Sequence, residues 1–202
     1  MLGVEPVRRH LDGAAQALET LAAEEPEVAA RVRVEEGVAE RLSAADASVD
    51  LIWCRDVLLH VEDLHTVFTE FHRVLKPGGH ALLFMMTATE WLTAAEAQRL
   101  WPVSAVHASS VDPRHIDAAI AASGLSIEQR VDLNGEIREF LEEAGVGRTS
   151  RQLLWISRLL RNRPVYEHQF GVAAYEVMLT DCLYGVYQMI GKLKPRIYLL
   201  IR

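Results

Sequence analysis

The sequence has few cysteines, no long hydrophobic run and fewer basic than acidic residues. Its two cysteines, Cys54 and Cys182, are too few for a disulfide framework and have apolar neighbours, as buried thiols in a reducing compartment do. No apolar run reaches the roughly 20 residues of a membrane-spanning helix. The first residues also lack the charged-then-apolar pattern of a signal peptide. These absences predict a cytoplasmic protein that has no membrane partner.

The shortage of basic residues also bears on the partner. A formal charge of −7 over 202 residues argues against nucleic acid, whose phosphates attract a basic surface. The length suits a single domain with one core. One arginine cluster is the local exception, and we interpret it as a solvated helix face. Its members are Arg148, Arg151, Arg158, Arg161 and Arg163.

The stretch 49–86 predicts the unit around which the fold is organised. A short apolar run at 49–53 has the length of a buried strand, and an apolar stripe at helical spacing follows over 64–75. Pro77-Gly78-Gly79 predicts a turn, and 81–86 is a second apolar strand. Strand, helix and strand in this order form a βαβ unit, and such units build parallel sheets.

The rest of the chain continues the alternation and predicts an α/β fold. Apolar spacing, caps, prolines and glycines give the element boundaries. Upstream, the expected elements are a strand end at 1–6, a helix at 7–23 and a strand at 31–35. Downstream, they are helices at 93–100 and 113–123, a strand at 125–133, helices near 136–144, 149–161 and 166–190, and a strand at 195–201.

The βαβ stretch also resembles a known family. An Asp before the first strand, then C-R-D-V-L-L-H-V and H-R-V-L-K-P-G-G, resemble the class I S-adenosylmethionine-dependent methyltransferases. The similarity is to the small-molecule branch that includes ubiquinone and menaquinone methylases. It implies a Rossmann-like, mostly parallel sheet with helices on both faces and an antiparallel terminal hairpin. It divides the single domain 1–202 into a core at 1–133, a helical lid insertion at 134–192 and a terminal strand at 193–202.

The chain departs from that family at its beginning. The family's first strand ends in a glycine-rich loop, G-x-G-x-G, and the sequence has no such loop. By the resemblance the first βα unit is absent, and we expect roughly 40 further residues upstream in a complete protein. The absent strand is central, so we expect a gap or an unpaired edge in the sheet. A sheet closed by another chain is the less favoured alternative.

The resemblance implies S-adenosylmethionine as the cofactor and places its nucleoside on two turns. Glu5, with Pro6 beside it, stands where the family has an acid that accepts hydrogen bonds from the ribose. The alternative is that Glu5 only complements the dipole of the following helix. Val38 and Ala39 match a turn in which the family has an Asp for the adenine amino group. Val38 removes that acceptor, which leaves packing and backbone contact.

The end of the strand at 49–53 supplies the remaining candidates. By the resemblance, Cys54 and Arg55 contact the methionine part of the cofactor, and Asp56 and His60 face the substrate. His60 is the candidate general base, since imidazole takes a proton near neutral pH. A helix-start histidine bonded to backbone is an equal alternative. Cys54, in an apolar strand end, is expected to stay a thiol.

A metal site is not expected. His60 and His65, at a spacing of five residues, do not share a helix face, so with Cys54 they do not form a metal-binding set.

These residues predict methyl transfer from S-adenosylmethionine to a small-molecule acceptor, at oxygen, nitrogen or carbon. The alternative is an inactive or truncated methyltransferase-like binding module, which the absent loop and Val38 favour. A nicotinamide dehydrogenase is rejected because no G-x-G-x-x-G follows a strand. The expected partner is a small-molecule substrate, and a homodimer is left open.

Overall fold

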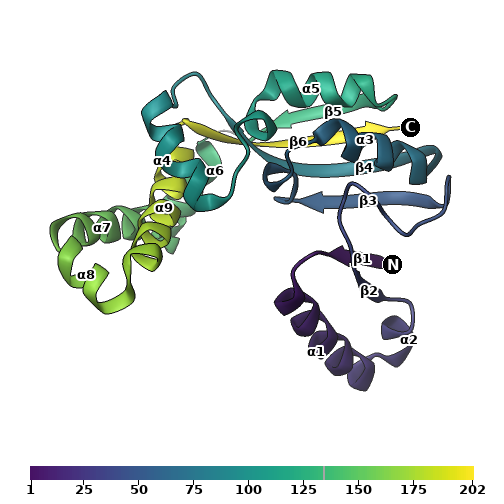
Figure 1. Cartoon of the computed structure of the whole chain (residues 1–202), viewed down its shortest axis with the longest axis horizontal. Helices are drawn as coiled ribbons and strands as arrows, with labels where there is room; N and C mark the ends of the chain where they lie inside the picture. The colour runs from purple at the N-terminus through teal and green to yellow at the C-terminus, as the bar shows by residue number, and fades with distance from the viewer. Residues whose placement is uncertain (134) are drawn as a thin grey trace.

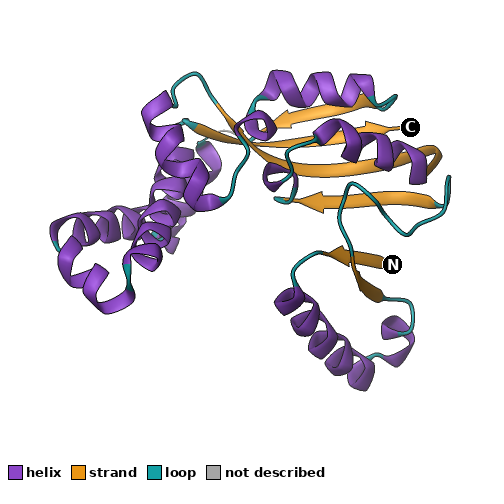
Figure 2. Ribbon diagram, viewed as in Figure 1, coloured by secondary structure: helices purple, strands orange, loops and turns teal. Residues whose placement is uncertain are grey.

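The computed structural model describes residues 1–133 and 135–202, and Figure 1 shows three parts. The first part is a small N-terminal unit of two strands and two helices. The second is a four-stranded sheet with helices packed on it, and the third is a helical lobe that extends from one end of that sheet (Figures 1 and 2). Among the described helices, none combines the length and the apolar character needed to cross a membrane.

The described elements alternate as an α/β protein requires. The strands are β1 Leu2–Glu5, β2 Arg33–Glu36, β3 Val49–Arg55, β4 Leu75–Ala88, β5 Ser126–Asp132 and β6 Leu193–Ile201. The α-helices are α1 Arg8–Glu24, α2 Pro26–Ala29, α3 Leu64–Val74, α4 Ala94–Ser104, α5 Pro113–Ala122, α6 Glu136–Leu141, α7 Arg148–Arg161, α8 Arg163–Phe170 and α9 Val172–Met189. Two short 3₁₀ helices are η1 Leu58–His60 and η2 Ala108–Val111, and η3 Glu142–Val146 is a π-helical turn.

The strands form two separate sheets. β1 and β2 pair in parallel, and the larger sheet has the order β3-β4-β6-β5. β3 and β4 are parallel, whereas β6 is antiparallel to both β4 and β5, so the terminal hairpin is confirmed. β1 and β3 point the same way in Figure 1, yet each is hydrogen-bonded on one edge only. The expected break in the sheet is therefore present, between β1 and β3.

The main core lies where α3 and α5 pack on the larger sheet. α3 begins at Asp63, whose side chain accepts a hydrogen bond from the backbone N–H of Thr66 at 3.0 Å. The predicted stripe of α3, which includes Val67, Phe68 and Phe71, is buried against β4 and β6. α5 begins at the predicted Asp112 cap. The capping and periodicity rules thus gave these two helices correctly.

The N-terminal unit has no comparable core. Between residues 1 and 57, all of which are described, no residue belongs to the buried class. Helix α1 packs with α2, β2 and β1, and its apolar side is only half covered. β3 is likewise covered on one face, because Leu51 is 56% exposed and Trp53 70% exposed. The open edge between β1 and β3 therefore coincides with apolar surface that lacks a covering element.

The predicted turn at Pro77-Gly78-Gly79 takes another form. These residues lie within β4 as a bulge, since Val49 pairs with Leu75 whereas Leu51 pairs with His80. Gly78 has φ +77°, which only glycine adopts readily. The chain therefore loops out inside the strand, and β4 is longer than the predicted 81–86.

The predicted single helix at 166–190 is wrong. The structure has two helices, α8 and α9, separated by Gly171 at φ +84°. Together with α7 they form the end of the helical lobe, which holds a small core of Leu159, Tyr175 and Leu179. α7 and α9 approach closely because Gly185 has no side chain: a Cβ there would lie 2.0 Å from Oε1 of Gln152. Asn134, the first residue of the predicted lid, lies outside the described residues.

Candidate functional site

The carboxyl end of β3 brings four predicted site residues together. Cys54 and Arg55 end the strand, Asp56 follows it, and His60 ends the short helix η1. Ligands of open α/β sheets bind at this edge of the sheet. The guanidinium of Arg55 lies 5.8 Å from the ring centroid of Phe84 on the neighbouring strand β4. This contact fixes the end of β3 against β4.

Cys54 is held as a neutral thiol. Burial raises its pKa from the ordinary 9.0 to about 11, and the charge of Asp56 adds to the rise. The sulfur packs against the main core. The nucleophilic form is the thiolate, so Cys54 is suited to packing at the strand end and not to covalent catalysis.

This pKa gives a direct prediction for thiol labelling. At pH 8 only about one Cys54 side chain in a thousand is a thiolate, so a thiol reagent should modify it far more slowly in the native protein than in denaturant. The thiol's contribution to stability is full below pH 9 and is lost as the pH rises through about 11. Labelling of Cys54→Ala and of Cys182→Ala shows which of the two cysteines has reacted with the reagent. Rapid native labelling of Cys54 at pH 8 would contradict the prediction.

Asp56 has a strained backbone. Its φ is +53°, in a region that non-glycine residues seldom adopt, and its N–H donates to the carbonyl of Phe84 at 2.9 Å. Partial desolvation raises the pKa of its carboxyl group, opposed by the charges of Arg55 and His60. Strain of this kind is found where a side chain must be aimed at a ligand. The geometry therefore presents Asp56 as a carboxylate at the edge of the sheet.

His60 is fixed in one tautomer. Its Nδ1 lies 2.9 Å from the carbonyl oxygen of Ala105, at the end of α4. A carbonyl can only accept, so Nδ1 carries the proton and Nε2 of the neutral ring holds the lone pair. The ring is exposed. His60 is therefore hydrogen-bonded to the backbone, as the alternative interpretation expected. The same contact leaves Nε2 available as a base.

Tyr184, on α9 of the helical lobe, packs against the hydrophobic cluster that contains Leu59 of η1. Burial raises the pKa of Tyr184 on α9, and the charge of Asp56 raises it further. Tyr184 therefore stays a phenol that can donate a hydrogen bond. The lobe is tied to α4 by an ion pair between Lys192 and Glu96, with Nζ 2.5 Å from Oε1. That lysine holds the pKa of Glu96 at about 2.

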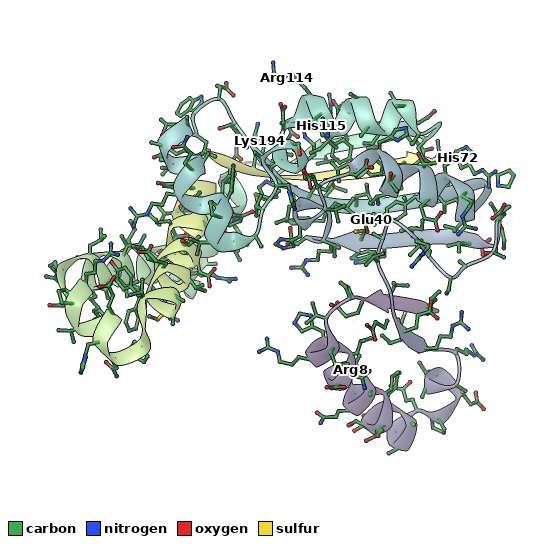
Figure 3. All side chains as sticks on the ribbon, viewed as in Figure 1. Arg8, Glu40, His72, Arg114, His115 and Lys194 are labelled. Carbon is green, nitrogen blue, oxygen red and sulfur yellow. The ribbon has the colours of Figure 1, made fainter. Side chains whose placement is uncertain are left out.

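A pocket of about 660 Å³ lies at the carboxyl ends of β1 and β2. This volume is in the range of small-ligand sites, about 300–1,000 Å³. Figure 3 places Glu40 on the connection that leads from this region toward the larger sheet. Two predicted cofactor residues, Pro6 and Val38, line the pocket. The other lining residues are Val4, Glu35, Glu36, Gly37, Arg41, Leu42 and Ser43.

Glu5 makes contacts at the start of α1. Its Oε1 accepts a hydrogen bond from the N–H of Val7 at 2.9 Å and lies 3.2 Å from Nδ1 of His10. Oε2 makes no hydrogen bond within residues 1–133 and 135–202. Oε1 thus binds the N-terminal end of α1, in line with the alternative that Glu5 complements the dipole of this helix. Oε2 is available to a ribose hydroxyl. The ribose role of Glu5 stays a prediction.

The predicted residues therefore fall into two groups. Glu5 and Ala39 lie beside the pocket and Pro6 and Val38 line it, whereas the residues of the β3 end lie across the break in the sheet. Sequence reasoning missed Glu36, Arg41 and Ser43. The local sequence pattern does not identify these three residues as pocket residues, because they come together only when β1 and β2 pair.

The residues at the two strand ends fit the two halves of S-adenosylmethionine unequally. The pocket volume, its place at parallel strand ends and the free oxygen of Glu5 suit the adenosine half. The methionine half would extend toward β3, where the described strands leave the break. The described residues thus fit the adenosine half of the cofactor better than its methionine half.

Comparisons with known proteins agree with the fold. Residues 8–83 match a family described as "Methyltransferase domain". The dimethylglycine N-methyltransferase of Parasynechococcus marenigrum is 33% identical over 100 residues, which are 48% of this chain and 35% of that protein.

Two solved structures cover the whole chain. Phosphoethanolamine N-methyltransferase 2 of Haemonchus contortus, in complex with S-adenosyl-L-methionine, has a TM-score of 0.65 at 20% identity, over 100% of this chain and 43% of that one. The cyclase SpnF has a TM-score of 0.69 at 19% identity, and the match covers 100% of this chain and 66% of that one. At these identities the likeness shows the fold.

The sheet order, the helical insertion and these matches define the class: an α/β protein with the class I methyltransferase fold. Residues 8–83 match the methyltransferase-domain family, and the rest of the chain shares the fold of solved S-adenosylmethionine-dependent methyltransferases. The chain spans about a third of the length of the curated relative that it matches.

Proposed function

We propose that this protein transfers a methyl group from S-adenosylmethionine to a small-molecule acceptor. The observation that carries the proposal is the group formed by Asp56, His60 and Tyr184 at the carboxyl end of β3. Within the domain, 1–133 supplies the pocket and most of the strands, 134–192 acts as the lid, and 193–202 adds the strand that lies between β4 and β5. A cytoplasmic location and a homodimer stay predictions.

An amine is the acceptor that this group suits best. The carboxylate of Asp56 attracts a cationic or partly protonated nitrogen, and the phenol of Tyr184 can orient it. Nε2 of His60 can accept the proton that the nitrogen must lose as it is methylated. The bound cofactor supplies an electrophilic methyl group. The N-methyltransferase activity named for the curated relative supports the same choice.

Calorimetric titration with S-adenosylmethionine tests the cofactor assignment. We expect heat of binding from the wild-type chain, weakened about fivefold by Glu5→Gln if Oε2 receives a ribose hydroxyl. Glu27→Gln, an exposed acid on α2, is the matched control and should leave the affinity unchanged. Absence of heat from a folded sample would overturn the assignment for this chain.

The second candidate is a nucleoside-binding module without catalysis. The unpaired edges of β1 and β3 favour it, as does the apolar Val38 at the adenine turn. In that case adenosine should bind as tightly as S-adenosylmethionine, and a panel of small amines should receive no methyl group. Val38→Asp should strengthen the binding of adenosine and of S-adenosylmethionine whether or not the protein is an enzyme. This variant therefore does not separate the two functions.

A further inference from the structure

Helix α7 has a strongly basic outer face. It carries Arg148, Arg151, Arg158 and Arg161 and no acidic residue, in a chain whose net charge is −7. Within the described residues none of these four forms an ion pair with a carboxylate. By contrast, Arg163 at the start of α8 pairs with Glu167 and Glu176. Glu142, beside the start of α7, lies near enough for the charge of Arg151 to lower the pKa of its carboxyl group. The charge of the other three arginines is available to a partner.

The basic residues share their face with two large apolar side chains. α7 turns Thr149 and Leu159 inward, and both are buried. The helical period of 3.6 residues then places Arg151, Arg158 and Arg161 outward together with Leu154, which is 48% exposed. Arg148, exposed in the first turn, and Trp155, 46% exposed, lie at the margin of this side, next to the buried Leu159. The guanidinium of Arg158 lies 5.2 Å from the ring centroid of Trp155. We call these six residues the α7 face.

We propose that the α7 face binds the surface of an anionic lipid membrane. A helix that combines arginines with tryptophan and leucine lies at the headgroup boundary, with its charges on lipid phosphates and its apolar groups inserted. This partner revises the expectation that the arginine cluster is only a solvated face. It is a peripheral contact, which needs no membrane-spanning helix, and it does not depend on the proposed methyl transfer.

The charge distribution favours lipid over the other occupants. A second copy of the chain, placed face to face, would set four arginines against four. Nucleic acid would extend over the acidic remainder of the chain, which repels it. Figure 1 shows α7 in the outer part of the lobe with α8, away from both sheets, so a membrane can contact the lobe without contacting the sheets. At physiological salt the more distant acids are screened beyond about 8 Å.

Co-sedimentation with vesicles tests the proposal on the full chain. The probes are phosphatidylcholine vesicles with and without about 30 mol% phosphatidylglycerol. We expect binding to the anionic vesicles only, weakened as salt rises. Arg151→Gln with Arg158→Gln should lower the affinity about 25-fold, since each basic residue near the surface contributes about fivefold. Arg8→Gln with Arg9→Gln, two exposed arginines of α1, is the matched control and should bind like the wild type.

Insertion of the apolar residues has a separate readout. The fluorescence difference between wild type and Trp155→Phe should shift to shorter wavelength when anionic vesicles are added, because Trp155 leaves water. Circular dichroism verifies that each variant is folded. Three results would overturn the proposal: no binding to anionic vesicles at low salt, equal loss in both double variants, or tighter binding of a single-stranded oligonucleotide than of vesicles. A change of oligomeric state caused by Arg151→Gln would overturn it in favour of a second copy.

Discussion

Amide hydrogens of β1, α1 and β2 are expected to exchange with solvent at least about a thousandfold faster than those of β4 and β6. The reason is the absence of buried residues between positions 1 and 57. A two-stranded sheet is marginal by itself, and a helix in a protein takes most of its stability from tertiary packing, which α1 has little of. The larger sheet is different, because β4 and β6 pair over nine residues and share the main core. Its exchange should require opening near the global free energy of unfolding, about 5–15 kcal/mol.

Hydrogen exchange followed by mass spectrometry measures this difference within one sample. Peptides from α3, whose apolar stripe is buried, supply the internal reference. Exchange of 1–36 should be close to that of an unfolded chain, whereas α3 should follow β4. Equal protection of β1 and β4 would contradict the prediction and would mean that the break in the sheet does not weaken the N-terminal unit.

The sequence was sufficient to predict elements whose signals are local. The pair Asp112-Pro113 predicts the start of α5, and the side chain of Asp112 caps that helix. Thr93, one of two threonines that could cap α4, caps it, and Asp63, an acid expected to complement the dipole of α3, also caps its first turn. The break in the sheet was also predictable, because it depends on a motif that is missing from the sequence. These features need no knowledge of distant neighbours.

Other features depend on partners that the local sequence does not name. The helical spacing of apolar residues continues through Gly171, so this spacing did not indicate that α8 ends at Phe170. The bulge in β4 depends on which residues pair with Val49 and Leu51. In the site, Tyr184 was one of many aromatic residues of the expected lid. Only the folded lobe brings its phenol under the charge of Asp56.

The motif R-V-L-K-P-G-G was recognised by resemblance, and the structure gives its arginine a physical role. The guanidinium of Arg73 bonds both carboxylate oxygens of Glu70 at 2.7 Å and Oδ1 of Asp46 at 2.5 Å. It also donates to the carbonyls of Leu42 and Ala44, at 3.2 and 3.0 Å. Arg73 therefore holds the segment 42–46, which leads from the pocket to β3, against α3.

Replacing Arg73 with alanine is expected to lower the free energy of unfolding by about 2 kcal/mol. The loss follows because Glu70, whose side chain is only 12% exposed, would keep its charge without its partner. The figure is moderate because the arginine itself is 34% exposed, and solvent screens such pairs. Arg73→Lys should recover less than half of the loss, since one ammonium group cannot match the planar fork. Urea denaturation measures each value.

Arg8→Ala is the matched control, because Arg8 forms a fully accessible pair with Asp12 in α1 and should change the stability little. The same variants separate anchoring from general stability. Arg41 lines the pocket directly before the anchored segment, and Leu42 and Ser43 line it within that segment, so under the proposed function Arg73→Ala should weaken calorimetric binding of S-adenosylmethionine at temperatures where the chain is still folded. Equal stability losses in Arg73→Ala and Arg8→Ala, with unchanged binding, would contradict the anchoring role. A loss of stability and of binding in Arg73→Ala alone would connect the family motif to the pocket through the 42–46 segment.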